Sequence, residues 1–262
     1  MLLCYYYFYS YIYLDHPMVI ILEQVKVLGI HSSPRKYGES YKLLRIALEA
    51  ARREGAEVDL VYLGEYDIKP CIGCVSDDIL ACRFPCVIED DSFNTIGRKM
   101  LEYDGYIIST PVYWYSVSGI LKNFIDRLTS MENMIYHTGR SYLEGKVAGF
   151  IAVGNDTGAL ATISWLMVTM VSMGVHVPAW SLAYHEQKTS VESNRAALLD
   201  AANVGRVVTL SAKLLKSQKA WYDTSLDEVI SSTLPEISRE VGELEKEQRP
   251  LREKLWGGRA SS

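Results

Sequence analysis

Four of the five cysteines lie close together in the chain and form its strongest candidate for a metal or redox centre. Cys71, Cys74, Cys82 and Cys86 have the spacing Cys-x2-Cys-x7-Cys-x3-Cys. Thiolates clustered in this way bind soft metals and iron–sulfur clusters. The same residues are also compatible with tetrahedral zinc, with two disulfides, or with free thiols left from a lost metal site. The spacing predicts a centre between residues 71 and 86 and leaves these alternatives open.

A second candidate site is the segment Ser-Ser-Pro-Arg-Lys-Tyr-Gly-Glu-Ser at residues 32–40, which joins a predicted strand to a predicted helix. The hydroxyls of Ser32, Ser33 and Ser40, the guanidinium of Arg35 and the first N–H groups of the helix are together suited to bind a phosphate. The segment lacks the glycines of the two common nucleotide motifs, which disfavours a triphosphate and a dinucleotide pyrophosphate. The alternative is that Ser40 only caps the helix and Arg35 is only a surface charge.

Three consecutive aromatic residues form a third candidate site. Tyr113, Trp114 and Tyr115 follow Pro111, which ends a predicted strand. A flat, mostly apolar ring system such as an isoalloxazine needs aromatic or apolar faces and backbone groups at its rim. The alternative is that the aromatic rings pack beneath their own loop. Neighbours in an extended segment point in opposite directions, so at most one or two of the three can do so.

A fourth candidate is the segment Gly-Asn-Asp-Thr-Gly at residues 154–158, which follows another predicted strand. Because glycine has no side chain, Gly154 and Gly158 allow the backbone to approach a planar ligand closely. The alternative is an ordinary turn in which Asp156 or Thr157 caps the next helix.

These candidate segments follow short apolar runs that are typical of buried strands. After most of these runs comes a segment whose apolar residues recur at helical spacing. Strands are predicted at 24–31, 57–64, 104–111, 146–154 and 175–180, and helices at 41–54, 92–103, 118–131, 159–174 and 191–217. This alternation predicts an α/β fold with a five-stranded parallel sheet and helices on both faces. In the doubly wound order 2-1-3-4-5 the ligand lies at the carboxyl ends of the first and third strands.

The bulk composition is that of a globular protein. The chain has 262 residues, of which 48% are hydrophobic, and its formal net charge of −5 provides no electrostatic footprint for nucleic acid. We expect a main domain at 23–218, preceded by an extension at 1–22 and followed by a charged helical tail at 219–262. The extension begins with an apolar run that is too short to span a membrane and lacks the features of a signal peptide. Its Tyr-rich segment is an ordered extension, a membrane-surface segment, or sequence upstream of a true start at Met18.

The candidate loops resemble those of a known family. The segment His-Ser-Ser-Pro-Arg-Lys-Tyr-Gly-Glu-Ser is similar to the phosphate loop GSPRK-x-GNT of the NADPH-dependent FMN reductase and iron–sulfur flavoprotein family. Residues 110–127 are similar to that family's aromatic-loop signature, including Lys122, Phe124, Asp126 and Arg127. Lys122 and Asp126 also stand four apart on one helix face, which is typical of a plain surface ion pair. The resemblance covers about residues 24–190 and implies a flavodoxin-like three-layer fold.

The resemblance also implies which residues bind FMN and which bind a cluster. Glu39 departs from the family's asparagine, so its carboxylate should point away from the phosphate and its backbone N–H should bind. The third cysteine of the family's motif would fall at Asp77, so the third ligand of a 4Fe–4S cluster here would be Cys82. The residues implied for FMN are Ser33, Arg35, Glu39, Ser40, Pro111, Val112, Tyr113, Trp114, Tyr115, Ser116, Gly154, Asn155 and Gly158, and those implied for the cluster are Cys71, Cys74, Cys82 and Cys86.

The function implied by the resemblance is the transfer of electrons from NAD(P)H through FMN to free flavin, a quinone or another acceptor. No acid–base residue is required, because the flavin supplies the chemistry. Two alternatives remain: an electron carrier between protein partners without nicotinamide turnover, and a scaffold that has lost the flavin. We also expect a cytoplasmic homodimer or homotetramer without a transmembrane span.

Overall fold

A five-stranded sheet forms the centre of the computed structural model, which describes residues 24–218, 221–223 and 226–257. The strands are β1 (Lys26–His31), β2 (Glu57–Tyr62), β3 (Gly105–Pro111), β4 (Val147–Gly154) and β5 (Leu182–Glu186). Their order is β2-β1-β3-β4-β5, and every neighbouring pair is parallel. The predicted flavodoxin-like order is therefore confirmed. The Tyr-rich segment at the start of the chain lies outside the described residues.

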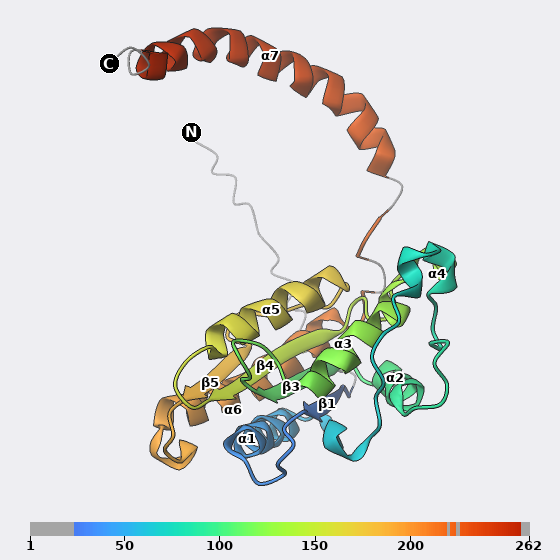
Figure 1. Ribbon diagram of the computed structural model, residues 1–262, viewed down its shortest axis with the longest axis vertical. Helices are drawn as coiled ribbons and strands as arrows, with labels where there is room; N and C mark the ends of the chain where they lie inside the picture. Colours follow the sequence, from blue (N-terminus) through green and yellow to red (C-terminus); the bar gives the residue numbers. More distant parts are fainter. Residues whose placement is uncertain (1–23, 219–220, 224–225, 258–262) are drawn as a thin grey trace, which may run out of the picture.

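Helices cover both faces of this sheet and create two separate cores (Figure 1). The helices are α1 (Glu39–Arg53), α2 (Phe93–Leu101), α3 (Gly119–Glu132), α4 (Ile135–Thr138), α5 (Ala159–Ser172), α6 (Arg195–Leu215) and α7 (Asp227–Gly257). Buried side chains of α1 and α6 pack on one face, and those of α2, α3 and α5 pack on the other. Among the described residues no helix is both long and apolar enough to cross a membrane.

Helix α1 forms because its apolar residues recur at helical spacing and face the sheet. Leu43, Leu44, Ala47 and Leu48 are all buried on this face. Helix α6 packs against α1 at very close range through Gly205, since a Cβ there would stand 1.8 Å from the carbonyl oxygen of Ala47. The contact fixes α1, and with it the loop at the amino end of α1.

The expected fifth strand at 175–180 is wrong. In the structure His176 makes an isolated β-bridge to Val147, and the chain then turns before β5 begins at Leu182. Pro178 has no N–H with which to continue the ladder, and Trp180 adopts a left-handed conformation with φ 64°. The true edge strand shows the alternation of a half-buried strand, with Ala183 and His185 turned inward.

Candidate functional site

A cavity of about 380 Å³ lies where the carboxyl ends of β1, β3, β4 and β5 meet. Four loops contribute to it, as expected for a ligand site at the switch point of a doubly wound sheet. Its lining consists of Ser33, Arg35, Tyr37, Gly38, Glu39, Ser40, Pro111, Val112, Tyr113, Val153, Gly154, Asn155, Gln187, Lys188, Thr189 and Ser190.

Nine of the thirteen residues expected to contact FMN line this cavity, and they come from three separate segments. Trp114, Tyr115, Ser116 and Gly158 are outside its lining, although they adjoin it in the chain. Residues 187–190 line the cavity and were not anticipated. The misplaced fifth strand hid them, because the true carboxyl end of β5 lies directly before this polar segment.

A chain of buried hydroxyls holds the loop at 32–40 in place. Ser118 donates to the carbonyl oxygen of Ser32 at 2.9 Å, and Ser32 donates to that of Ser109 at 3.1 Å. Ser109 in turn donates to the carbonyl oxygen of Ser40 at 2.8 Å. Because buried polar groups are costly to leave unpaired, these bonds fix the first loop to β3 and to the start of α3.

The same loop has the features of an anion site. The hydroxyls of Ser33 and Ser40 each lie 3.9 Å from the position that a Cβ on Gly38 would occupy, so they converge on one point. The N-cap of α1 is Gly38, and no side chain in the described part of the chain caps the helix, so the interpretation of Ser40 as the cap is wrong. The first N–H groups of α1, with their partial positive charge, lack a side-chain acceptor that would compete with an anion.

The carboxylate of Glu39 is turned away from these hydroxyls, as expected. It accepts a hydrogen bond from the N–H of Val191 at 2.7 Å and pairs with Lys42 at 3.2 Å. Burial alone would raise the pKa of Glu39, but these two donors outweigh burial and lower it. Glu39 is therefore held as an anion that links α1 to the segment after β5.

The aromatic residues form a tight and strained turn. The N–H of Tyr113 donates to the carbonyl of Ser116 at 2.9 Å, and the N–H of Ser116 donates back at 3.1 Å. Between them Trp114 and Tyr115 have φ values of 49° and 63°, which bulky residues rarely adopt. Trp114 is 94% exposed, so its conformation is not explained by burial within the chain. Strain of this kind tends to concentrate where a ligand is held.

Gly158 packs directly against this turn. Its φ is 99°, and a Cβ there would stand 3.0 Å from Val112 and 3.1 Å from the ring of Tyr115. Gly158 is itself the N-cap of α5, and no side chain among the described residues caps that helix, so the alternative that Asp156 or Thr157 caps it is wrong. The loop after β4 and the aromatic turn thus form one surface, with the outer faces of Tyr113 and Tyr115 exposed.

His31 lies fully buried beneath the first loop. Its Nε2 is 3.4 Å from the carbonyl oxygen of Arg35, and its ring packs between Tyr41 and Tyr62. Its Nδ1 has no hydrogen-bond partner among the described residues. Desolvation lowers the pKa of His31 below 6.5, although the Arg35 carbonyl partly opposes this. The protein therefore contains a neutral histidine under the candidate anion site.

We expect this histidine to make the domain less stable in mild acid. Neutral His31 contributes its full stabilisation of the folded domain above pH 6.5, the pKa of a histidine in the unfolded chain. This stabilisation is lost as the pH falls from 6.5 through the lower pKa of the folded protein, because the unfolded chain binds the proton first. The free energy of unfolding, measured with urea, should therefore fall less between about pH 7.5 and about pH 5.5 in His31→Gln than in the wild type. His176, whose pKa burial also lowers, is the same in both proteins and cancels. Equal losses in the two proteins would contradict the prediction.

The cysteine segment is anchored to α3 by a buried arginine. Arg127 pairs with Asp91 at 2.7 Å with both side chains fully buried, and its Nε donates to the sulfur of Cys86 at 3.2 Å. It also donates to the carbonyl oxygens of Lys69 and Ile88. This role was not anticipated from the sequence. By contrast, Lys122 and Asp126 form the plain exposed ion pair that their spacing suggested.

Two asparagines fix the backbone on either side of these thiols. Asn94 accepts from the N–H of Cys86 and donates to its carbonyl oxygen, and Asn133 donates to the carbonyl oxygen of Cys82 at 2.7 Å. Asn94 and Asn133 are both nearly buried. The segment is thus a fixed part of the domain and not a free loop.

The four thiols are free of disulfides and are partly gathered. Burial, together with the neighbouring thiols of Cys74, Cys86 and Cys71, raises the pKa of Cys82 to about 12. The N–H of Gly73 donates to Cys71, a contact that suits a thiolate ligand. Within the described part of the chain, however, no three His, Cys, Asp or Glu side chains stand in a metal-binding arrangement. The donor chemistry fits a soft metal, whereas the geometry is not that of a formed site.

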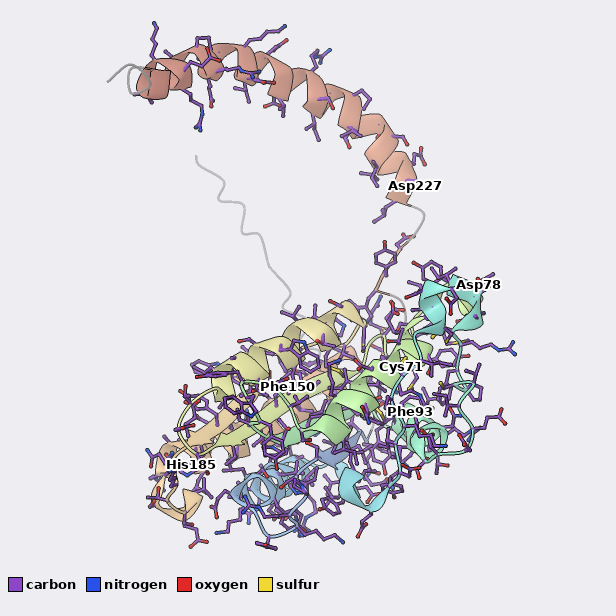
Figure 2. The ribbon with its side chains drawn as sticks, viewed as in Figure 1. Cys71, Asp78, Phe93, Phe150, His185 and Asp227 are labelled. Atoms are coloured by element: carbon purple, nitrogen blue, oxygen red, sulfur yellow. The ribbon has the colours of Figure 1, made fainter. Side chains whose placement is uncertain are left out.

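The cavity lies at the amino end of α3, whereas the cysteine segment lies along the second half of this helix. Ser118, before its first residue, contacts the loop at 32–40, whereas Asn133, after its last, contacts Cys82. A helix of 14 residues is about 21 Å long. Figure 2 shows Cys71 and His185 in different parts of the domain, and His185 lies next to the loop at 187–190.

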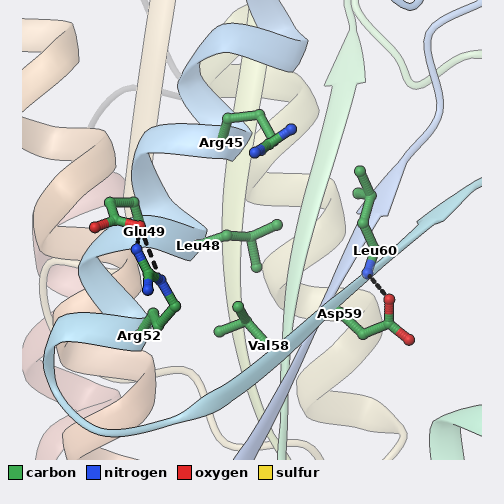
Figure 3. Close-up of a pocket in the computed structure, with 7 residues that line it drawn as sticks. All are labelled: Arg45, Leu48, Glu49, Arg52, Val58, Asp59 and Leu60. Atoms are coloured by element: carbon green, nitrogen blue, oxygen red, sulfur yellow. Dashed lines mark hydrogen bonds and ion pairs between the residues drawn. The ribbon is translucent and has the colours of Figure 1, made fainter.

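A second hollow of similar volume lies on the outside of the domain, between α1 and the edge strand β2 (Figure 3). Its sides carry the ion pair between Glu49 and Arg52 and the half-buried side chains of Val58 and Leu60. It is far from the carboxyl ends of the central strands and includes none of the candidate site residues. The four-loop cavity is therefore the candidate ligand site.

Comparison with known proteins shows the family and the fold of the chain. A family model described as NADPH-dependent FMN reductase matches residues 25–189. An iron–sulfur flavoprotein of Methanocaldococcus jannaschii is 32% identical over 206 residues, which cover 73% of this chain and 100% of that protein. An iron–sulfur flavoprotein of Archaeoglobus fulgidus is 36% identical over 134 residues, which cover 51% of this chain and 56% of that protein. The solved structure of RosB with 8-demethyl-8-formylriboflavin-5'-phosphate shares the fold, with a TM-score of 0.66 at 20% identity over 81% of this chain and 87% of that one.

Proposed function

This chain belongs to the NADPH-dependent FMN reductase family, and on that premise we propose that it binds FMN in the four-loop cavity and passes electrons from NAD(P)H to a further acceptor. The observation that carries the proposal is the meeting of two loops. Ser33, Arg35 and Ser40 line the same cavity as Pro111, Val112 and Tyr113, although some seventy residues separate the two groups. One cavity thus offers both an anion site and an apolar, aromatic wall.

The residues of the cavity fit FMN part by part. The hydroxyls of Ser33 and Ser40, the guanidinium of Arg35 and the free start of α1 bind the phosphate. Val112 and the aromatic turn hold one side of the ring system, and the residues Gly154, Asn155 and Gly158 lie along its edge. Arg35 and Lys188 add positive charge to the lining.

FMN supplies the redox chemistry, accepting a hydride and releasing electrons singly or in pairs. The chain's own part is to orient the ring and to leave one face open to a nicotinamide. The exposure of Tyr113 and Tyr115 at the rim favours such an open face. We assign no side chain as a catalytic acid or base.

We further propose that Cys71, Cys74, Cys82 and Cys86 hold an iron–sulfur cluster. Relatives named iron–sulfur flavoproteins support this, as do the N–H and guanidinium donors directed at Cys71 and Cys86. Iron and acid-labile sulfide in anaerobically purified protein, in a ratio near one to one, would support a cluster. Zinc in place of iron, or no metal at all, would contradict it.

The function is tested by the visible spectrum and by the oxidation of NADH and NADPH. The purified protein should contain bound FMN and should oxidise one nicotinamide with added flavin or quinone as acceptor. A flavin-loaded protein that oxidises neither nucleotide would instead be an electron carrier. A colourless protein that takes up no FMN would contradict the proposal.

We expect the strained conformation of Trp114 to lower the stability of the FMN-free protein and its side chain to raise the affinity for FMN. Asparagine tolerates a positive φ better than tryptophan, so Trp114→Asn should stabilise the FMN-free protein by about 1 kcal/mol. It should also weaken FMN binding by about tenfold, because the variant loses a stacked aromatic contact that contributes about 1 kcal/mol. Urea unfolding and fluorescence titration with FMN measure the two effects.

Trp180 provides the matched control for this variant. It also has a positive φ and is 80% exposed, but it precedes β5 and lies at the amino end of the sheet. Trp180→Asn should give the same gain in stability and no change in FMN affinity. If Trp114→Asn also left the affinity unchanged, Trp114 would have no contact with the ring.

A further inference from the structure

Helix α7 carries one continuous apolar stripe with a strict heptad pattern. Apolar residues recur at alternating intervals of four and three residues along the helix, with one polar residue in the series. The stripe consists of Ile230, Leu234, Ile237, Val241, Leu244, Gln248, Leu251 and Leu255. A period of 3.5 residues sustained over this length is the pattern of a coiled coil, with Ile230, Ile237, Leu244 and Leu251 at d positions.

This stripe has no partner within the described chain. Each of its apolar residues is exposed, from Leu244 at 44% to Leu255 at 77%. Figure 1 shows α7 standing clear of the sheet and its covering helices. The family match ends at residue 189 and does not include α7. A helix of 31 residues with one apolar face gains its stability from packing that face against another element.

We propose that α7 pairs with α7 of a second copy of this chain as a parallel, in-register, two-stranded coiled coil. Leucine, isoleucine and valine at a and d positions fill the seam between two such helices. The pairing covers the whole apolar stripe of both chains at once, because the stripe is complementary to itself.

Gln248 selects the register and the direction. It is the polar residue at an a position, and in a parallel pair it faces the partner's Gln248, so the two amides bond to each other. In a fully overlapping antiparallel pair it would instead face the partner's Ile237 and lose hydrogen bonds on burial.

The charges beside the seam agree with this direction. In the parallel pair Glu247 at a g position faces the partner's Arg252, which gives two attractive contacts per dimer. Glu240 faces the partner's Glu245, but Arg249 of the same chain as Glu245 binds that carboxylate at 2.8 Å and reduces the repulsion. The antiparallel pair would place Glu240 against the partner's Glu247 and gain no attractive contact in return.

The two prolines of α7 do not obstruct the seam. Pro235 and Pro250 occupy b and c positions on the outer side of the helix, away from the stripe. Each removes one helical hydrogen bond and bends the helix locally. The seam residues on either side keep their heptad positions, so the pairing surface stays continuous.

The mass of the full-length protein in solution tests the pairing. Light scattering should show that Leu244→Glu, which places a carboxylate in the seam, halves the mass of the assembly at equal concentration. Ser232→Glu adds the same charge at an outer f position and should leave the mass unchanged. Circular dichroism of both variants would confirm that the domain itself is folded. An unchanged mass for Leu244→Glu would overturn the proposal.

Crosslinking tests the direction. Under mild oxidation Gln248→Cys should form a disulfide between two full-length chains, because position 248 meets its own copy only in the parallel register. The wild type, which keeps its other cysteines, is the control and should remain uncrosslinked. Absence of the crosslink in an assembly that Leu244→Glu disrupts would overturn the parallel register.

Discussion

Replacing Arg127 with methionine is expected to destabilise the domain by about 3–5 kcal/mol, the largest effect of any single substitution considered for this chain. The variant removes the cation from an ion pair whose two side chains are fully buried. Asp91 then remains as a buried carboxylate without its counter-ion. The carbonyl oxygen of Lys69 loses the donor Arg127, and that of Ile88 keeps only the donor Asn94. Urea unfolding followed by circular dichroism would measure the loss.

The matched control lies on the same helix one turn away. Lys122 and Asp126 form an exposed pair at 2.7 Å, and such pairs contribute about 0.5 kcal/mol or less. Lys122→Met should therefore change the free energy of unfolding very little. If the two methionine variants were equally stable, the buried pair would not anchor the cysteine segment.

A double variant distinguishes the loss of the ion pair from the cost of leaving the Asp91 carboxylate buried without its counter-ion. Arg127→Met combined with Asp91→Leu removes both charges, so it should be more stable than the sum of the two single losses predicts. A loss equal to that sum would mean that the two side chains stabilise the domain independently. The comparison thus tests the ion pair itself and not only the loss of packing.

Replacing Arg35 with glutamine is expected to weaken FMN binding by about tenfold to a hundredfold, the effect of losing one charge-assisted hydrogen bond to the phosphate. Arg35 lines the cavity beside the converging hydroxyls of Ser33 and Ser40. Riboflavin carries the same ring without the phosphate, so its affinity should stay unchanged. Fluorescence titration of both ligands against the flavin-free protein provides the measurement.

Lys36 is the control for the charge of this loop. It follows Arg35 directly, but it pairs with Glu65 and lies outside the lining of the cavity. Lys36→Gln should leave the affinity for both ligands unchanged. An equal loss of FMN and riboflavin affinity in Arg35→Gln would mean that the guanidinium acts on the ring or on the fold and not on the phosphate.

Local patterns identified most of the fold and the segments of the site. Apolar periodicity, which depends on residues close together in the chain, predicts the strands β1 to β4 and the long helices. The loops after β1 and β3 could be placed together because parallel strands end at one edge of the sheet. The order of the strands and this meeting of the loops are confirmed.

The failures arose where distant residues decide the conformation. Residues 175–180 are as apolar as a strand, but they pair at a single bridge, and the edge strand lies after them. The loop at 187–190 was missed for the same reason. Arg127 has the sequence context of a surface charge, because its partners Asp91 and Cys86 are brought to it by the path of another segment.

The amino-acid sequence therefore identified the candidate segments of the site: the serines and arginine of the first loop, the aromatic turn and the four cysteines. These are properties of residue type and spacing, which need no partner to be recognised. The folded arrangement decided which of them meet. It brought four loops to one cavity, placed Cys82 and Cys86 beside the second half of α3, and buried Arg127, because these outcomes depend on contacts between residues far apart in the chain.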